Sequence, residues 1–214
     1  GIGEALARHY ANQRATLGLA ARRQDLLQQL AAEFASPVSI YPLDVRDSPA
    51  LQIAAQDFIT RHGVPDILIA NAGSGVGTTT ELAEDLAHFQ TTLDVNVMGM
   101  VKTFQPFVAA MRTQKTGTLV GIASVAGYRG MPGSPAYSAS KAAAISYLDG
   151  LRIELRDSGV KVCTICPGFI DTPMTQSNPF PMPFIISAED AAKRFAHVIT
   201  QQRSHATIPW QMAG

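Results

Sequence analysis

TLVGIAS, at residues 118–124, is a short apolar run that ends on a serine. A second run of the same kind, Ile67-Leu68-Ile69, comes shortly before Asn71. Neither run alternates in polarity, which is typical of strands that helices cover on both faces of a parallel sheet. Both runs therefore predict buried parallel strands.

Helical and strand patterns alternate outward from these two runs along the whole chain. The expected helices cover residues 3–13, 23–35, 48–62, 84–113, 134–158 and 188–201. The expected strands cover residues 15–20, 38–43, 66–70, 118–123, 160–166 and 207–209. This alternation predicts one α/β domain over residues 1–214, with a doubly wound, Rossmann-like parallel sheet and helices on both faces.

Composition excludes several classes of protein. Lysine plus arginine and aspartate plus glutamate each total 17 of 214 residues, so the formal charge is zero. A neutral chain lacks the field that gathers nucleic acid or anionic lipid, and no run of 18 apolar residues is present to span a membrane. Apolar residues make up 46%, which excludes disorder. We expect a cytoplasmic protein.

The cysteines and histidines show no pattern typical of a metal site or a disulfide. Cys163 and Cys166 lie three apart on a predicted strand, so their side chains should point to opposite faces. The five histidines, His205 among them, have no ligand spacing and no paired cysteine, so we expect surface or packing roles. We expect no metal site.

The strongest chemical signal is a tyrosine and a lysine four residues apart, Tyr137 and Lys141. This spacing places both on one helix face. A phenol titrates near 10, and an ammonium held nearby should lower that pKa, which makes an acid/base pair for carbonyl reduction. Ser124, at a strand end, would donate a hydrogen bond to the carbonyl oxygen. The alternative is a solvated tyrosine and a surface lysine on an ordinary amphipathic helix.

Four further segments accompany this pair in a fixed order along the chain. They are Gly1-Ile2-Gly3, Asn71-Ala72-Gly73 after a strand, Asn96 inside a long helix, and the stretch from Pro167 through Gly168 and Ile170 to Thr172. In order and spacing, the set resembles the short-chain dehydrogenase/reductase family over essentially the whole chain. The resemblance implies four catalytic roles, with Tyr137 as general acid/base, Lys141 as its tuning residue and ribose ligand, Ser124 orienting the carbonyl, and Asn96 anchoring a water in the proton relay.

The resemblance also implies a nicotinamide cofactor site at the carboxyl ends of the strands. It assigns adenine contacts to Asp44 and Val45, the cofactor cleft to Asn71, Ala72 and Gly73, and the nicotinamide and neighbouring phosphate to Pro167, Gly168, Ile170 and Thr172. Gly1, Ile2 and Gly3 match the end of the family's glycine-rich turn, which opens a pyrophosphate-binding helix. We expect roughly ten or more residues upstream of Gly1, including a first strand.

Two arginines decide which cofactor we expect. Arg22 and Arg23 stand where an NAD site would carry an acidic residue for the adenosine ribose. Two cations at a helix N-terminus oppose the helix dipole unless an anion is near, and a 2′-phosphate supplies that anion. We expect NADP(H) in preference to NAD(H). The alternative is two solvated arginines, partly balanced by Asp25.

Two apolar segments bear on the substrate and on assembly. Residues 173–187 form a proline-rich lid loop, with prolines at 173, 179, 181 and 183, which stops helices and ladders. Its apolar residues would either cover an apolar substrate or pack on the protein body or a partner chain. The helix over 84–113 is apolar on more than one face, which predicts a homodimer or homotetramer; the alternative is a buried helix in a monomer.

We therefore expect an oxidoreductase that reduces a ketone or aldehyde, or oxidises the matching alcohol, with NADP(H). A non-catalytic NADP(H)-binding regulatory protein is the second hypothesis. It would have no need to keep Asn96, Ser124, Tyr137 and Lys141 together. Lyase or epimerase chemistry is the third, and such relatives have longer substrate regions.

Overall fold

The computed structural model describes residues 1–176, 178 and 180–213. Its helices are α1 (Ile2–Asn12), α2 (Gln24–Ala32), α3 (Ser48–His62), α4 (Asp85–Leu93), α5 (Gly99–Gln114), α6 (Pro135–Glu154) and α7 (Ala188–Thr200). The strands are β1 (Leu17–Ala21), β2 (Val38–Pro42), β3 (Ile67–Ala70), β4 (Thr118–Ile122), β5 (Lys161–Pro167), β6 (Ile170–Asp171), β7 (Ile186–Ser187) and β8 (His205–Ile208). Short helices cover η1 (Asp94–Met98), η2 (Val125–Gly127) and η3 (Trp210–Met212).

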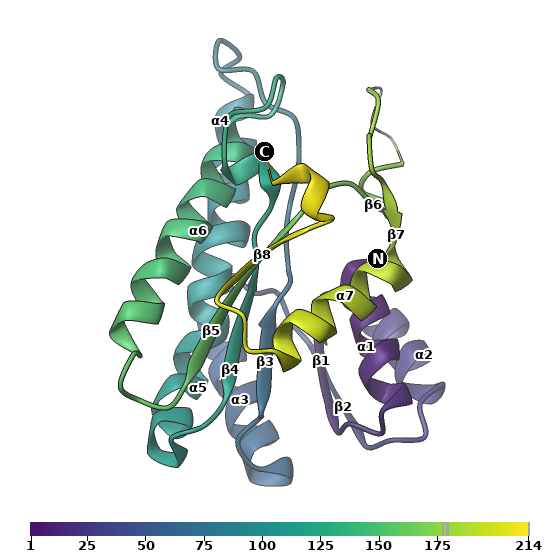
Figure 1. Ribbon diagram of the computed structural model, residues 1–214, viewed down its shortest axis with the longest axis vertical. Helices are drawn as coiled ribbons and strands as arrows, with labels where there is room; N and C mark the ends of the chain where they lie inside the picture. Colours follow the sequence, from purple (N-terminus) through teal and green to yellow (C-terminus); the bar gives the residue numbers. More distant parts are fainter. Residues whose placement is uncertain (177, 179, 214) are drawn as a thin grey trace.

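The strands pair in parallel throughout the described residues (Figure 1). β3, β4, β5 and β8 form a four-stranded sheet in that order, and β1 pairs with β2 in a separate two-stranded sheet. Within the described part of the chain, β1 is hydrogen bonded to β2 alone and β3 to β4 alone, so each of these two strands pairs along one edge. The alternation of strands and helices gives a single Rossmann-like α/β domain, as the sequence predicts.

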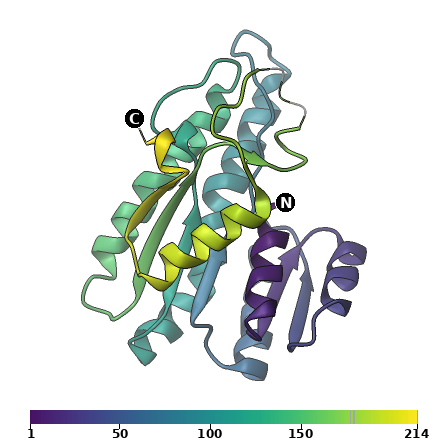
Figure 2. The ribbon, with the colours of Figure 1, turned by 45° about the vertical axis from the view of Figure 1, so that its right-hand side comes forward.

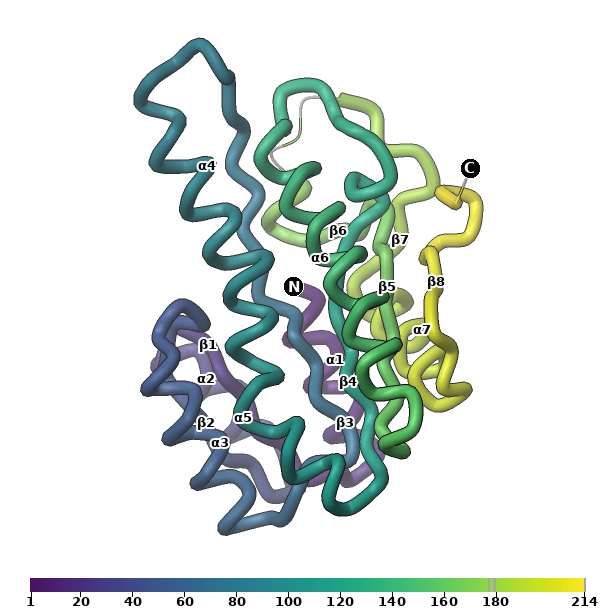
Figure 3. Tube along the Cα trace, turned by 90° about the vertical axis from the view of Figure 1, so that its left-hand side faces the viewer, coloured from purple at the N-terminus to yellow at the C-terminus, as the bar shows by residue number. Residues whose placement is uncertain are grey.

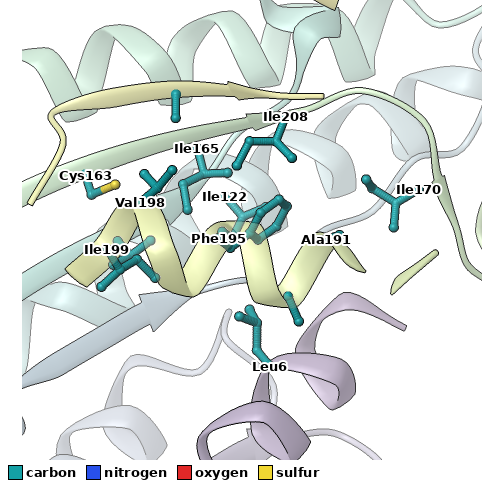
Figure 4. Close-up of a cluster of buried hydrophobic side chains, with 13 residues drawn as sticks. Leu6, Ile122, Cys163, Ile165, Ile170, Ala191, Phe195, Val198, Ile199 and Ile208 are labelled. Atoms are coloured by element: carbon teal, nitrogen blue, oxygen red, sulfur yellow. The ribbon is translucent and has the colours of Figure 1, made fainter. Parts of the chain in front are cut away.

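Helices cover both faces of the four-stranded sheet because its strands carry apolar side chains on both faces. On one face, Ile122 and Ile165 pack against Phe195 of α7 and Leu6 of α1 (Figure 4). α1 and α7 lie side by side there (Figure 2). Leu119 points to the opposite face, as alternation along a strand requires, and packs against residues of α5 and α6. The two faces together bury the core of the domain.

The long helix predicted over 84–113 is present, but it is not a uniform α-helix. α4 and α5 are joined by η1, a π-helical turn over Asp94–Met98. Figure 3 shows the α4 end of this helix extending beyond the sheet. A π-turn inside an α-helix is often found at functional sites, and here it carries Asn96.

Loops at the carboxyl ends of β3, β4 and β5 gather at one end of the sheet (Figure 1). The predicted lid loop rises from the same end, and its base is closed by the parallel pair β6–β7. Two of its residues, Ser177 and Pro179, lie outside the described residues. Ligands of open α/β sheets bind at this end, so the site is expected there.

The remaining predictions about the fold have clear outcomes. Cys163 and Cys166 are both buried and free, and Cys163 belongs to the core on the α7 face. Among the described residues, no helix is long and apolar enough to cross a membrane. The sequence pattern missed the short strands β6 and β7 and started β8 at Thr207, two residues later than its first residue, His205.

Candidate active site

The tyrosine and lysine of the predicted acid/base pair lie on α6 as expected. The Lys141 ammonium is 5.6 Å from the centroid of the Tyr137 ring. Its Nζ donates a hydrogen bond of 2.9 Å to the carbonyl oxygen of Ile122, the last residue of β4. Lys141 is only 4% exposed, so α6 is tied to the sheet end by a buried charge-assisted bond.

Ser124 follows the end of β4 and lies in the same region as Tyr137 and Lys141. It caps η2, and its Oγ accepts a hydrogen bond of 3.1 Å from the backbone N–H of Ala126. η2 packs directly on α6, because a Cβ added at Gly127 would lie 2.7 Å from the carbonyl carbon of Lys141. Only glycine allows this approach, which holds the Ser124 hydroxyl beside the tyrosine–lysine pair.

The pKa of Tyr137 corrects one expectation. Burial raises the pKa of this phenol, and its interaction with the Ser124 hydroxyl only opposes the rise. The expected lowering of this pKa by Lys141 is wrong, because burial disfavours the phenolate more than any neighbour favours it. Burial also lowers the pKa of Lys141 to about 8. At neutral pH the phenol therefore carries its proton and is ready to act as an acid.

Asn96 lies on the π-turn, and its side-chain amide makes three hydrogen bonds. Its Oδ1 accepts a hydrogen bond of 2.8 Å from the N–H of Ser74, and its Nδ2 donates one of 2.9 Å to the carbonyl oxygen of the same residue. Nδ2 also donates to the Oγ of Ser140 at 2.8 Å. The side chain is 1% exposed, so its amide is fixed against the loop that follows β3.

Glycines allow the segments predicted to bind the cofactor to approach one another closely. A Cβ at Gly3 would lie 2.7 Å from Nδ2 of Asn71, and one at Gly1 would lie 3.8 Å from the side chain of Thr172. A Cβ at Gly73 would lie 3.5 Å from Oδ1 of Asn96 and 3.7 Å from Nζ of Lys141. The start of α1, the loop after β3 and the segment after β5 thus meet beside the catalytic pair, and Ile2 and Ala72 stand within these segments.

The residues predicted to lie near the adenosine follow the ends of β1 and β2. Val45 packs on the long helix, because a Cβ at Gly99 would lie 2.7 Å from its Cγ2. The Asp44 carboxylate is held by the guanidinium of Arg46, at 2.7 Å between Nη2 and Oδ2, which lowers the pKa of Asp44 to about 2. Arg22 and Arg23 are exposed, with Arg23 at the N-cap of α2.

In the segment after β5, the interactions that the structure shows are mainly those of the backbone. Pro167 ends the strand, and the N–H of Gly168 donates to the carbonyl oxygen of Ile208 at 2.9 Å. The Ile170 side chain is 2% exposed and belongs to the hydrophobic core, so this side chain is not available to a ligand. The backbone N–H of Thr172 is bonded to Thr175 Oγ1 at 3.1 Å.

These residues fit a nicotinamide dinucleotide. The buried Lys141 ammonium has one acceptor among the described residues, Ile122, and so has N–H groups left for ribose hydroxyls. The start of α1 carries free backbone N–H groups, the kind of group that binds pyrophosphate at helix N-termini, and its glycines allow Asn71 and Thr172 to approach it closely. The two exposed arginines stand at the start of α2, where an adenosine phosphate would add negative charge.

The lid loop leaves much of its apolar surface uncovered. Met174, Phe180, Phe184 and Ile185 are between 42% and 54% exposed. Other lid residues do pack on the protein body: Ile186 lies against the hydrophobic core, and the Phe180 ring is 6.0 Å from the ring of Phe169. Both alternatives for the lid therefore stay open. On the long helix, Leu86 and Met98 are 67% and 45% exposed, while Phe104 and Met111 are fully buried. One apolar face of that helix covers the sheet, and most of the other apolar side chains are also at least partly buried, so Leu86 and Met98 are exposed singly.

Two groups of residues were missed by sequence reasoning. Ser140 lies inside the tyrosine–lysine motif and contacts Asn96, but its spacing alone gave it no role. The Tyr128 hydroxyl lies 2.7 Å from Nε2 of His205, and the Cys166 Sγ lies 3.7 Å from the same nitrogen. The expectation that His205 has no paired cysteine is wrong, because β5 and β8 are neighbouring strands. No sequence spacing could have shown this pairing.

The chain is similar to known proteins over most of its length. The family described as short chain dehydrogenase matches residues 1–180. An uncharacterized oxidoreductase of Myxococcus xanthus is 36% identical over 216 residues, covering 100% of this chain and 85% of the relative. One from Staphylococcus aureus strain N315 is 34% identical, covering 95% and 88%.

Solved structures show the same architecture. An alcohol dehydrogenase from the archaeon Thermococcus sibiricus, complexed with 5-hydroxy-NADP, is 25% identical with a TM-score of 0.83, covering 97% of this chain and 91% of that one. L-Sorbose reductase from Gluconobacter frateurii, complexed with NADPH and L-sorbose, is 25% identical with a TM-score of 0.85, covering 97% and 90%.

Proposed function

The chain belongs to the short-chain dehydrogenase family of oxidoreductases, and we propose that it interconverts a ketone or aldehyde and the matching alcohol with NADP(H). One observation carries the proposal. Tyr137, Lys141 and Ser124 come together at the carboxyl end of the parallel sheet, with Asn96 fixed behind them.

We assign the proton chemistry to Tyr137. Its phenol is protonated at neutral pH because burial raises its pKa, so it donates its proton to the carbonyl oxygen as negative charge develops there. Ser124 already accepts from Ala126 and has its own hydroxyl proton to donate to the same oxygen. When bound, the reduced nicotinamide supplies the hydride.

Lys141 supports this reaction with a buried charge 5.6 Å from the centroid of the Tyr137 ring. Its ammonium is anchored on Ile122, so the remaining N–H groups point from a fixed position. Below pH 8 the lysine is mostly charged, and this charge stabilises the phenolate left after proton transfer. The buried position lets the charge act without screening by water.

We assign cofactor binding to Gly1, Ile2 and Gly3, to Asn71, Ala72 and Gly73, and to Pro167, Gly168, Ile170 and Thr172. Asp44 and Val45 would border the adenine, with Asp44 oriented by Arg46. Arg22 and Arg23 would bind a 2′-phosphate, which supports NADP(H) over NAD(H). The sorbose reductase that resembles this chain is complexed with NADPH.

The uncovered apolar lid supports an apolar substrate, because closing 42–54% exposed side chains over a ligand would remove that surface from water. The exposed apolar side chains of Leu86 and Met98 support assembly into a homodimer or homotetramer.

A cofactor-consumption assay tests the proposed function. A panel of ketones and aldehydes, with apolar and polar members, is offered with NADPH and with NADH while absorbance at the nicotinamide band is followed. We expect steady NADPH consumption that is larger for apolar substrates. NADPH binding without consumption across the panel would instead support the regulatory alternative.

A further inference from the structure

Ser140 is completely buried and stands between two residues of the candidate site. Its exposed fraction is 0%, and it lies on α6 between Tyr137 and Lys141. Its Oγ donates a hydrogen bond of 2.7 Å to the backbone carbonyl oxygen of Tyr137 and accepts one of 2.8 Å from Nδ2 of Asn96. A hydroxyl that the motif leaves without a role thus links the tyrosine's own backbone to the π-turn.

The direction of these bonds is fixed by the chemistry of the groups. A carbonyl oxygen only accepts, so the single hydroxyl proton of Ser140 is used on Tyr137. The group facing Ser140 must then be a donor, which is Nδ2 of Asn96 and not Oδ1. The bonds from Ser74 require the same orientation, because its N–H faces Oδ1 and its carbonyl faces Nδ2.

We propose that Ser140 is a positioning residue. By bonding to both residues, it fixes the position of the Asn96 amide on the π-turn relative to Tyr137 on α6. Without the Ser140 oxygen, one Nδ2 proton of Asn96 loses its acceptor in a place only 1% exposed. The amide must then shift or admit a water, because an unpaired buried donor is unfavourable. The bond of Ser140 to the Tyr137 carbonyl alone would be ordinary local back-bonding in a helix; the bond to Asn96 makes it a link between two elements.

The inference rests on the proposed function, and Ser140→Ala tests it with Ser138→Ala as the matched control. Ser138 is on the same helix and 5% exposed, but its hydroxyl accepts from the N–H of Met131. We expect Ser140→Ala to lower kcat about tenfold, with the KM for the carbonyl compound and the Kd for NADPH within about twofold of wild type. The solvent isotope effect on kcat should rise, because proton movement becomes more rate-limiting.

The double variant decides whether the effect passes through Asn96. In an Asn96→Ala background, Ser140→Ala should change kcat less than about twofold, since the partner is already lost. An equal loss of kcat from Ser138→Ala, an unchanged solvent isotope effect, or a full tenfold loss in the Asn96→Ala background would each overturn the inference.

A stability measurement separates this inference from the proposed function. If the wild type reduces no carbonyl compound, the proposed function fails, yet the link remains testable by thermal unfolding. If Ser140 and Asn96 stabilise the fold through one shared bond, the Tm losses of Ser140→Ala and Asn96→Ala should not add in the double variant. Additive losses would overturn the link whatever the activity.

Discussion

The Lys141 ammonium donates a 2.9 Å hydrogen bond to the carbonyl oxygen of Ile122, and this bond joins the helix of Tyr137 to the end of the strand that precedes Ser124. The buried cation is therefore part of the fold as well as of the site. Burial lowers its pKa from an ordinary 10.5 to about 8, which links the charge to stability.

Lys141→Met should change how stability depends on pH. Between about pH 8 and 10.5, the unfolded wild-type chain binds a proton that the folded chain has released, so the free energy of unfolding rises with pH. Lys141→Met lacks this contribution. Urea unfolding at several pH values should give a difference between wild type and variant that grows in favour of wild type across this window. A constant difference would contradict the shifted pKa.

Gly127→Ala should disturb the site through packing alone. Its Cβ would lie 2.7 Å from the carbonyl carbon of Lys141, so η2 or α6 must move. We expect a loss of about 1–3 kcal/mol in the free energy of unfolding, and a lower kcat because Ser124 is displaced. Gly130→Ala is the control, since a Cβ there has no neighbour within 4 Å among the described residues. Equal effects of both variants would show that the close approach of η2 is unimportant.

Replacing Arg22 and Arg23 by alanine should weaken the binding of NADPH and leave that of NADH unchanged. Loss of charge-assisted bonds to a 2′-phosphate should raise the KM for NADPH roughly tenfold or more, and leave the KM for NADH nearly unchanged. Arg112→Ala, an exposed arginine near the far end of α5, is the control. Parallel loss of both cofactors would remove the basis for NADP(H) preference.

Much of the fold was predictable because its signals are local. The apolar run ending at Ile122 and the helix carrying Tyr137 and Lys141 follow from residue type and spacing. The π-turn at Asn96 was not predictable, since it depends on hydrogen bonds to the loop after β3. The pairing of Cys166 with His205 needed two strands far apart in sequence to meet.

The sequence predicted which side chains lie close together better than it predicted their pKa values. The sequence placed a phenol beside an ammonium and favoured a lowered phenol pKa. Burial reversed that direction for Tyr137, because the degree of desolvation depends on how tightly η2 and α6 pack. Residue spacing carries no information about that packing.

The most direct test of the account is Tyr137→Phe, which removes only the phenolic oxygen. NADPH binding should persist, measured by fluorescence titration, while turnover of the best carbonyl substrate falls about 10²–10⁴-fold. Thermal unfolding would confirm that the variant is folded. Turnover close to wild type in a folded variant that binds NADPH would contradict the assignment of Tyr137 as the proton donor.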